Sequence, residues 1–103
     1  MTAYVGDEVW LNCTSNSTIG TDVEWWYQRQ SFPDPVYRHG IIQDGFQQQF
    51  TARKHSHKDY SLVISNVTFD NSGTYECREE TGKGRTHYYV LNVPGISHYV
   101  DIL

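Results

Sequence analysis

Short runs in which apolar and polar residues alternate recur along the chain, and polar segments rich in turn-forming residues separate them. In residues 8–13, for example, the side chains of Val9, Leu11 and Cys13 share one face under the two-residue period of a strand. The expected strands are residues 4–13, as two strands around a turn at 6–7, and residues 23–29, 36–38, 41–49, 50–53, 60–67, 73–78 and 86–93. The pattern predicts an all-β fold.

Residues 23–29 contain two adjacent tryptophans, and only one of them can face the interior of a sheet. If Val23, Trp25 and Tyr27 face inward, Trp26 is left on the outer face. If Trp26 faces inward instead, Glu24 also points into the interior, where an unpaired carboxylate costs several kcal/mol. We therefore expect Trp25 in the core and Trp26 exposed, with the opposite phase as the alternative.

The order and spacing of two cysteines, a tryptophan and a tyrosine carry a family resemblance. Cys13 is followed by Trp25 and then by the segment Asn-Ser-Gly-Thr-Tyr-Glu-Cys at residues 71–77. Over residues 5–93 the chain resembles the variable-type (V-set) domains of the immunoglobulin superfamily found in cell-surface receptors. The resemblance implies an immunoglobulin-like two-sheet sandwich with a variable-type Greek key, in which residues 41–49 are the segment that constant-type domains lack.

The resemblance also implies contacts in the interior. Cys13 and Cys77 would form a disulfide, and Trp25 would pack against it. The residues that we place in the core are Trp25, Tyr75, Leu62 and Leu11. A disulfide would indicate an oxidising compartment, whereas the alternative, two buried thiols, would fit a cytosolic protein.

Two departures from the family pattern indicate which V-set domains the chain resembles most. Variable-type domains usually carry an Asp six residues before the second Cys, paired with an Arg. Here that position is Asn71 and Asp70 is displaced by one, so an ion pair to Arg53 is in doubt. Residues 86–93 lack the Phe-Gly-x-Gly bulge of antigen receptors, which argues against an antibody or T-cell-receptor domain. The Val-Tyr-Arg-x-Gly segment at residues 36–40 is similar to that of butyrophilin-like, adhesion and immune-type receptors.

Length and charge restrict the domain count and the partners. The chain has 103 residues, enough for one domain, which we expect at residues 1–93, with 94–103 as a stalk or the start of a following segment. The net charge is -4 and the pI ≈ 5.6, so the long-range field repels phosphate backbones and anionic membranes. Nucleic acid is therefore not an expected partner.

Three N-x-[ST] sequons agree with secretion. The candidate glycan acceptors are Asn16, Asn66 and Asn12, of which Asn16 lies in an expected loop and Asn12 is compromised by the Cys in its sequon. No run approaches the ~20 apolar residues of a membrane span, and no apolar leader is present. We expect an excised ectodomain beginning at an expression-start Met1, from the extracellular side of the plasma membrane or from a secreted protein.

Motifs for catalysis or cofactor binding are absent from the sequence. It contains no Gly-x-Ser-x-Gly elbow, paired-carboxylate motif or phosphate-binding glycine loop. The spacing of His55 and His57 would put two imidazoles on one face of an extended segment, as in some metal sites. Because no third ligand is nearby in sequence, we expect a solvated turn there. We expect neither an enzyme nor a cofactor or metal site.

The functional hypothesis rests on one outer face, GFCC′ in the family's strand letters. Alternation places on it the candidate partner-binding residues Trp26, Gln28, Tyr37, Arg78, Tyr88 and Val90, together with Glu76. Aromatic residues and Arg are enriched at interface hot spots, which indicates a protein partner. We expect that partner to be another cell-surface immunoglobulin-type domain or a second copy of this chain, which would form a homodimer. The parent protein is expected to be a membrane-anchored receptor.

Two alternatives remain at the sequence level. Some V-set receptors bind sialylated glycans through an Arg that resembles Arg78 in position, so a glycan or a lipid headgroup is the second class of ligand. A structural spacer domain in a longer ectodomain is the third. The ordinary interpretation of the outward residues is that neighbouring long side chains partly cover them.

Overall fold

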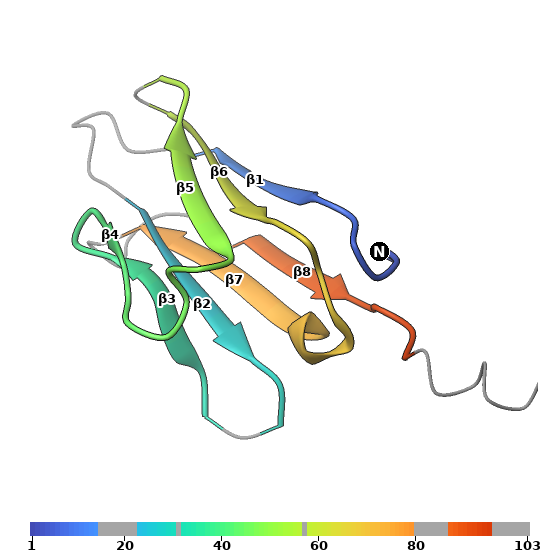
Figure 1. Cartoon of the computed structure of the whole chain (residues 1–103). Coiled ribbons are helices and arrows are strands. Elements are labelled where there is room, and N and C mark those ends of the chain that lie inside the picture. Colours follow the sequence, from blue (N-terminus) through green and yellow to red (C-terminus); the bar gives the residue numbers. More distant parts are fainter. Residues whose placement is uncertain (15–22, 31, 57, 80–86, 96–103) are drawn as a thin grey trace, which may run out of the picture.

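The structure is a computed structural model, shown in Figure 1, and it describes residues 1–14, 23–30, 32–56, 58–79 and 87–95. Eight strands and one short 3-10 helix lie within these residues. They are β1 (Val9–Thr14), β2 (Val23–Gln28), β3 (Asp34–Arg38), β4 (Ile41–Ile42), β5 (Phe50–Lys54), β6 (Asp59–Ile64), η1 (Phe69–Asn71), β7 (Gly73–Glu79) and β8 (His87–Leu91).

The strands form two antiparallel sheets that face each other (Figure 1). One sheet has the strand order β1-β6-β5 and the other has the order β4-β3-β2-β7-β8. The chain crosses between the sheets after β1, after β4 and after β6. As a result, β1 pairs with β6 and β2 pairs with β7, which are strands distant in sequence. This arrangement confirms the expected all-β, two-sheet sandwich with variable-type topology.

Two edge elements are shorter than the alternation pattern predicts. The segment before the turn at residues 6–7 contributes only a single parallel bridge, from Thr2 to Asn92 beyond the end of β8. The strand expected at residues 41–49 is reduced to the two residues of β4, and turns follow it. Both differences occur at sheet edges, where a short strand leaves fewer unpaired backbone groups.

The space between the sheets is filled by the inward residues of both. Trp25, Tyr75, Leu11 and Leu62 are each 0% exposed, in the positions expected for the core. Cys13 and Cys77 form a disulfide that joins β1 to β7 across the sandwich. Because it closes a loop of 64 residues, it contributes about 4 kcal/mol to the free energy of unfolding in the chain-entropy model.

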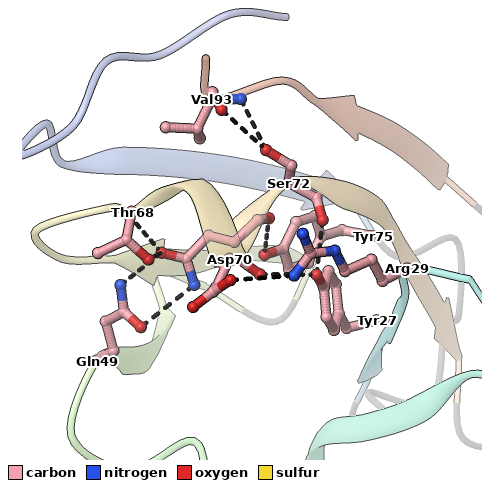
Figure 2. Close-up of polar contacts among 9 residues, drawn as sticks. Tyr27, Arg29, Gln49, Thr68, Asp70, Ser72, Tyr75 and Val93 are labelled. Carbon is pink, nitrogen blue, oxygen red and sulfur yellow. Dashed lines mark hydrogen bonds and ion pairs between the residues drawn. The ribbon is translucent and has the colours of Figure 1, made fainter. Parts of the chain in front are cut away.

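Tyrosine hydroxyl groups on β2 and β7 form hydrogen bonds to the backbone of the turn around η1 (Figure 2). The Tyr75 hydroxyl donates to the Asn71 carbonyl at 2.6 Å, and the Tyr27 hydroxyl donates to the Ser72 carbonyl at 2.6 Å. Burial raises the pKa of both hydroxyl groups, most strongly that of Tyr75, so each stays a neutral donor. Ser72 also accepts a hydrogen bond from the Val93 amide at 2.9 Å.

The ion pair that the family usually places beside this turn has a different form here. Asn71 and Gln49 exchange side-chain hydrogen bonds of 2.6 and 3.2 Å (Figure 2). Asp70 pairs with Arg29 at 3.2 Å, and both side chains are open to solvent. Arg53, the family's partner position, instead places its guanidinium 5.7 Å from the Trp10 ring. The doubt about an Arg53 ion pair is therefore justified by the geometry.

Candidate functional site

The outer face of the five-stranded sheet brings together side chains from all five strands. Register pairs Trp26 with Glu76 and Glu76 with Tyr88, so these three residues form a row across β2, β7 and β8. Tyr88 and Val90 on β8 are 66% and 63% exposed. Gln28 is exposed at the end of β2. We call the outer side chains of β2, β3, β4, β7 and β8 the five-strand face.

Trp26 is less exposed than the sequence predicts. Its ring lies 4.3 Å from the Arg78 guanidinium carbon and 5.7 Å from that of Arg38. Its Nε1 donates to Glu24 Oε1 at 2.9 Å. The indole is therefore half-buried between two cations, and cation–π attraction together with the hydrogen bond holds it against the sheet.

Glu24 is buried on this outer face rather than between the sheets. It is 9% exposed, beneath the side chains of Trp26 and Arg38. Arg38 Nε lies 3.6 Å from its second carboxylate oxygen, and Glu76 pairs with Arg78 at 3.0 Å. Each of these two carboxylates thus has a cationic partner, which offsets its loss of hydration. Within each pair the positive and negative charges cancel, so the two pairs add no net charge to the five-strand face.

The expected outward position of Tyr37 is wrong. Tyr37 pairs with Trp25, packs against the core and is only partly exposed. The register shifts between Trp25 and Trp26, because Val36 is an extra residue on β3 opposite that step. Counting by alternate residues across this irregularity assigns the wrong face to Tyr37.

Arg38 and Ile41 take the place of Tyr37 on the five-strand face. Arg38 reaches Trp26 and Glu24, and it pairs with Ile41, which is 62% exposed. Sequence reasoning missed both residues as well as the role of Glu24. Pro35 was the available signal, since a proline inside a sheet is tolerated mainly at edges and bulges.

Two hollows lie near this face. A small one of about 20 Å³ is lined by the three residues of the row and by four neighbours, namely Trp26, Glu76 and Tyr88 with Tyr27, Gln28, Pro33 and Thr74. A larger open hollow of about 500 Å³ lies beside the β3–β4 hairpin and is lined by Asp34, Pro35, Ile41, Ile42, Gln43, Asp44, Phe46 and Gln47. Neither Trp26 nor Tyr88 lines the larger hollow. Because it is open to solvent, it is a surface groove rather than an enclosed ligand cavity.

The outer face of the three-stranded sheet carries a second tryptophan, which sequence reasoning did not single out. Trp10 donates from Nε1 to Glu8 Oε1 at 2.7 Å and stacks with His55 at 6.2 Å between ring centres. Beneath these side chains, Val63 and Ser61 of the central strand β6 are 4% and 1% exposed. The same side-chain types, Trp with Glu and Arg, thus cover part of each sheet.

The remaining candidate residues lie outside the five-strand face. Asn12 and Asn66 are exposed, and Asn66 has a left-handed backbone with φ 53. Asn16 and His57 lie outside the described residues, while the His55 ring bonds to Ser61. Within the described ranges, no group of three His, Cys, Asp or Glu side chains is placed to hold a metal ion. Among those residues no helix is long and apolar enough to cross a membrane.

Comparisons with known proteins match most of the chain. Residues 1–88 match the sequence model of the family described as "Immunoglobulin domain". Basigin from Gallus gallus is 31% identical over 84 residues, which are 79% of this chain and 21% of that protein. The Ig kappa chain V region 3368 from Oryctolagus cuniculus is 28% identical over 82 residues, which are 78% of this chain and 73% of that protein. Basigin from Homo sapiens is 26% identical over 87 residues, 82% and 22% of the two chains. The chain therefore spans about a fifth of the length of either basigin.

Proposed function

The chain belongs to the immunoglobulin domain family, and from that premise we propose that it is the extracellular recognition domain of a cell-surface immune or adhesion receptor. It binds a protein partner through the five-strand face, without catalytic chemistry of its own. The partner is another immunoglobulin-type domain or a second copy of this chain. The parent protein is anchored in the plasma membrane or secreted.

The observation that carries this proposal is the composition of the five-strand face. Tyr88 and Val90 on β8 and Ile41 on β4 are each more than 60% exposed, so exposed apolar side chains lie on both edge strands of the sheet. Burying such side chains contributes roughly 25 cal/mol per Å² of apolar surface, and a sheet loses little backbone entropy on binding because it is already ordered. The half-buried Trp26 lies on β2, between these two edge strands, and Arg78 holds its ring in place.

The charges of this face favour a protein over an anionic small ligand. Arg78, the residue that an acidic sugar or a lipid headgroup would need, is already paired with Glu76 and stacked on Trp26. An anion would have to displace the Glu76 carboxylate, which lies 3.0 Å away on the same strand. A partner protein that packs on the apolar side chains leaves both ion pairs intact.

The test compares two exposed tyrosines in a screen of the folded domain against cell-surface proteins, including itself. Tyr88 is 66% exposed on the five-strand face, and Tyr4 is 64% exposed on the N-terminal segment, which borders β8 but is not one of the strands that define the face. We expect Tyr88→Ala to weaken partner binding by about 30-fold, as loss of a 2 kcal/mol hot spot does, and Tyr4→Ala to leave it unchanged. Equal affinities for both variants, or binding only to a glycan array, would contradict the proposal.

A further inference from the structure

The outer side of β1 carries an aromatic residue, an asparagine and a threonine at alternate positions. Trp10, Asn12 and Thr14 are exposed, whereas the residues between them are buried. β1 is an edge strand of the three-stranded sheet, so this row borders open solvent (Figure 1). Asn12 and Thr14 with Cys13 form an N-x-[ST] sequon. The strand therefore places a glycan acceptor two residues from an indole on the same face.

The amide of Asn12 is held in one orientation from its oxygen side. Ser61 Oγ donates to Asn12 Oδ1 at 2.7 Å, and His55 Nε2 lies 3.0 Å from the same Ser61 oxygen. Because the single hydroxyl proton of Ser61 is used toward Asn12, His55 Nε2 carries a proton and donates to Ser61. Among the described residues, nothing bonds to Asn12 Nδ2, the atom to which an N-linked sugar is attached. Attachment of a sugar there leaves the hydrogen-bond chain intact.

The indole of Trp10 is also fixed, and much of it is uncovered. Its Nε1 bonds to Glu8, while Arg53 and His55 approach the ring at 5.7 and 6.2 Å. After these contacts Trp10 is still 43% exposed. Alternate residues on a strand are about 7 Å apart, which is within reach of a sugar linked to the longer Asn side chain. The C–H face of a pyranose is apolar and gains dispersion and burial by packing against an aromatic ring.

We propose that Asn12 carries an N-linked glycan whose first sugar, an N-acetylglucosamine, packs on Trp10. The sugar comes from a lipid diphosphate-linked oligosaccharide: Asn12 Nδ2 bonds to C1 and loses a proton, and the C1–phosphate oxygen bond breaks to release the lipid diphosphate. Cys13 is 3% exposed and disulfide-bonded in the folded chain, so transfer precedes closure of the disulfide. Asn66 lacks an exposed aromatic residue two positions before it, because that position is Ile64, which is 0% exposed.

Occupancy is tested by secreting the full 103-residue chain from a glycosylating eukaryotic cell and mapping its glycopeptides by mass spectrometry. We expect sugar on Asn12 in the wild-type chain and none in Thr14→Val, which removes the acceptor hydroxyl but keeps the β-branched shape. Wild-type protein without sugar on Asn12 would overturn the proposal, whatever the state of the other two sequons.

Packing on Trp10 is tested after trimming the glycan enzymatically to its first sugar, so that glycan size plays no part. We expect the ring protons of that sugar to show upfield NMR shifts from the indole, and the trimmed chain to melt about 3 °C above Thr14→Val. In a Trp10→Ala background both effects should disappear. Sugar proton shifts equal to those of a free glycopeptide would overturn the packing directly, even where Trp10→Ala fails to fold.

Discussion

Trp25 and Trp26 are neighbours in sequence but contribute to the protein in opposite ways. Trp25 is 0% exposed and faces the disulfide side of the sandwich, paired with Cys77. Trp26 lies on the outer face, held by the guanidinium of Arg78 and the carboxylate of Glu24. The first is needed for the core, whereas the second shapes a surface.

Separate substitutions of the two tryptophans distinguish these roles. We expect Trp25→Ala to lower the free energy of unfolding by about 3–5 kcal/mol, enough to prevent stable folding of a domain of this size. Trp26→Ala should cost only about 1–2 kcal/mol, because Glu24 keeps Arg38 as a partner, while partner binding is lost. Denaturant unfolding and a binding assay on the same samples check both. A Trp26→Ala variant that unfolds would contradict the assignment of faces.

Gly73 and Gly45 offer a matched pair for testing backbone strain. Both have positive φ, +149 and +90. A Cβ at Gly73 would lie 2.7 Å from the Gln28 carbonyl oxygen and 2.7 Å from the Tyr27 ring, whereas a Cβ at Gly45 would meet nothing within 4 Å. We therefore expect Gly45→Ala to cost about 1 kcal/mol and Gly73→Ala to cost at least about 3 kcal/mol, as measured by denaturant unfolding. Equal losses would mean that β2 can move away from β7 at little cost.

At the scale of elements, β2 and β3 show what the sequence could and could not predict. In β2 the cost of an unpaired Glu24 between the sheets decided which tryptophan faced inward, and the structure agrees with that choice. In β3 the same alternation rule failed, because the extra residue opposite the Trp25–Trp26 step changes the phase. A bulge depends on contacts between strands, so it leaves only a weak trace in sequence, here Pro35.

The candidate site could be predicted from the sequence where its strands are regular, but not next to the bulge in β3. Tyr88, Val90 and Gln28 lie on regular parts of β8 and β2, and their exposure follows from alternation. Arg38 and Ile41 belong to the hairpin after the bulge, so their positions required the structure. The burial of Glu24 was also unpredictable, since it depends on Arg38 reaching across from β3.

The tyrosine hydroxyl bonds between β7, β2 and the η1 turn predict how stability depends on pH. Burial raises the pKa of Tyr75 above its ordinary value of about 10, so the folded state disfavours the phenolate. A raised pKa contributes stability that is fully present below pH 10 and is lost as the pH rises further, because the unfolded chain then releases the proton. We expect the free energy of unfolding to fall above about pH 10, and less steeply in Tyr75→Phe. The same slope in wild type and Tyr75→Phe would assign the loss to other groups.

At the scale of the whole molecule, the two sheets present different outer surfaces. The three-stranded sheet carries Trp10 and Asn12, the glycan acceptor that we propose, whereas the five-strand face exposes apolar side chains and paired charges. The disulfide and the shared core keep the two surfaces on opposite sides of the sandwich. A sugar on Asn12 would therefore leave the five-strand face open, because the whole thickness of the domain separates them.

In contrast to a sugar on Asn12, a glycan attached to the five-strand face should block partner binding. Tyr88→Asn combined with Val90→Thr creates a sequon on the outer side of β8, whose two altered positions are 66% and 63% exposed. We expect the glycosylated double variant to keep its fold and to lose partner binding entirely, because a branched sugar cannot be accommodated in a packed interface.

The control for this variant is Tyr88→Gln combined with Val90→Thr, which removes the same side chains but cannot be glycosylated. It should bind at least about 10-fold better than the glycosylated variant, since only the sugar distinguishes the two. Removing the Asn12 sugar with Thr14→Val should leave affinity unchanged, because that acceptor lies on the opposite sheet. Surface plasmon resonance on folded, mass-verified samples measures all three. Binding that survives the β8 glycan would place the recognition surface on another part of the molecule, and binding that falls in Thr14→Val would place it on the three-stranded sheet.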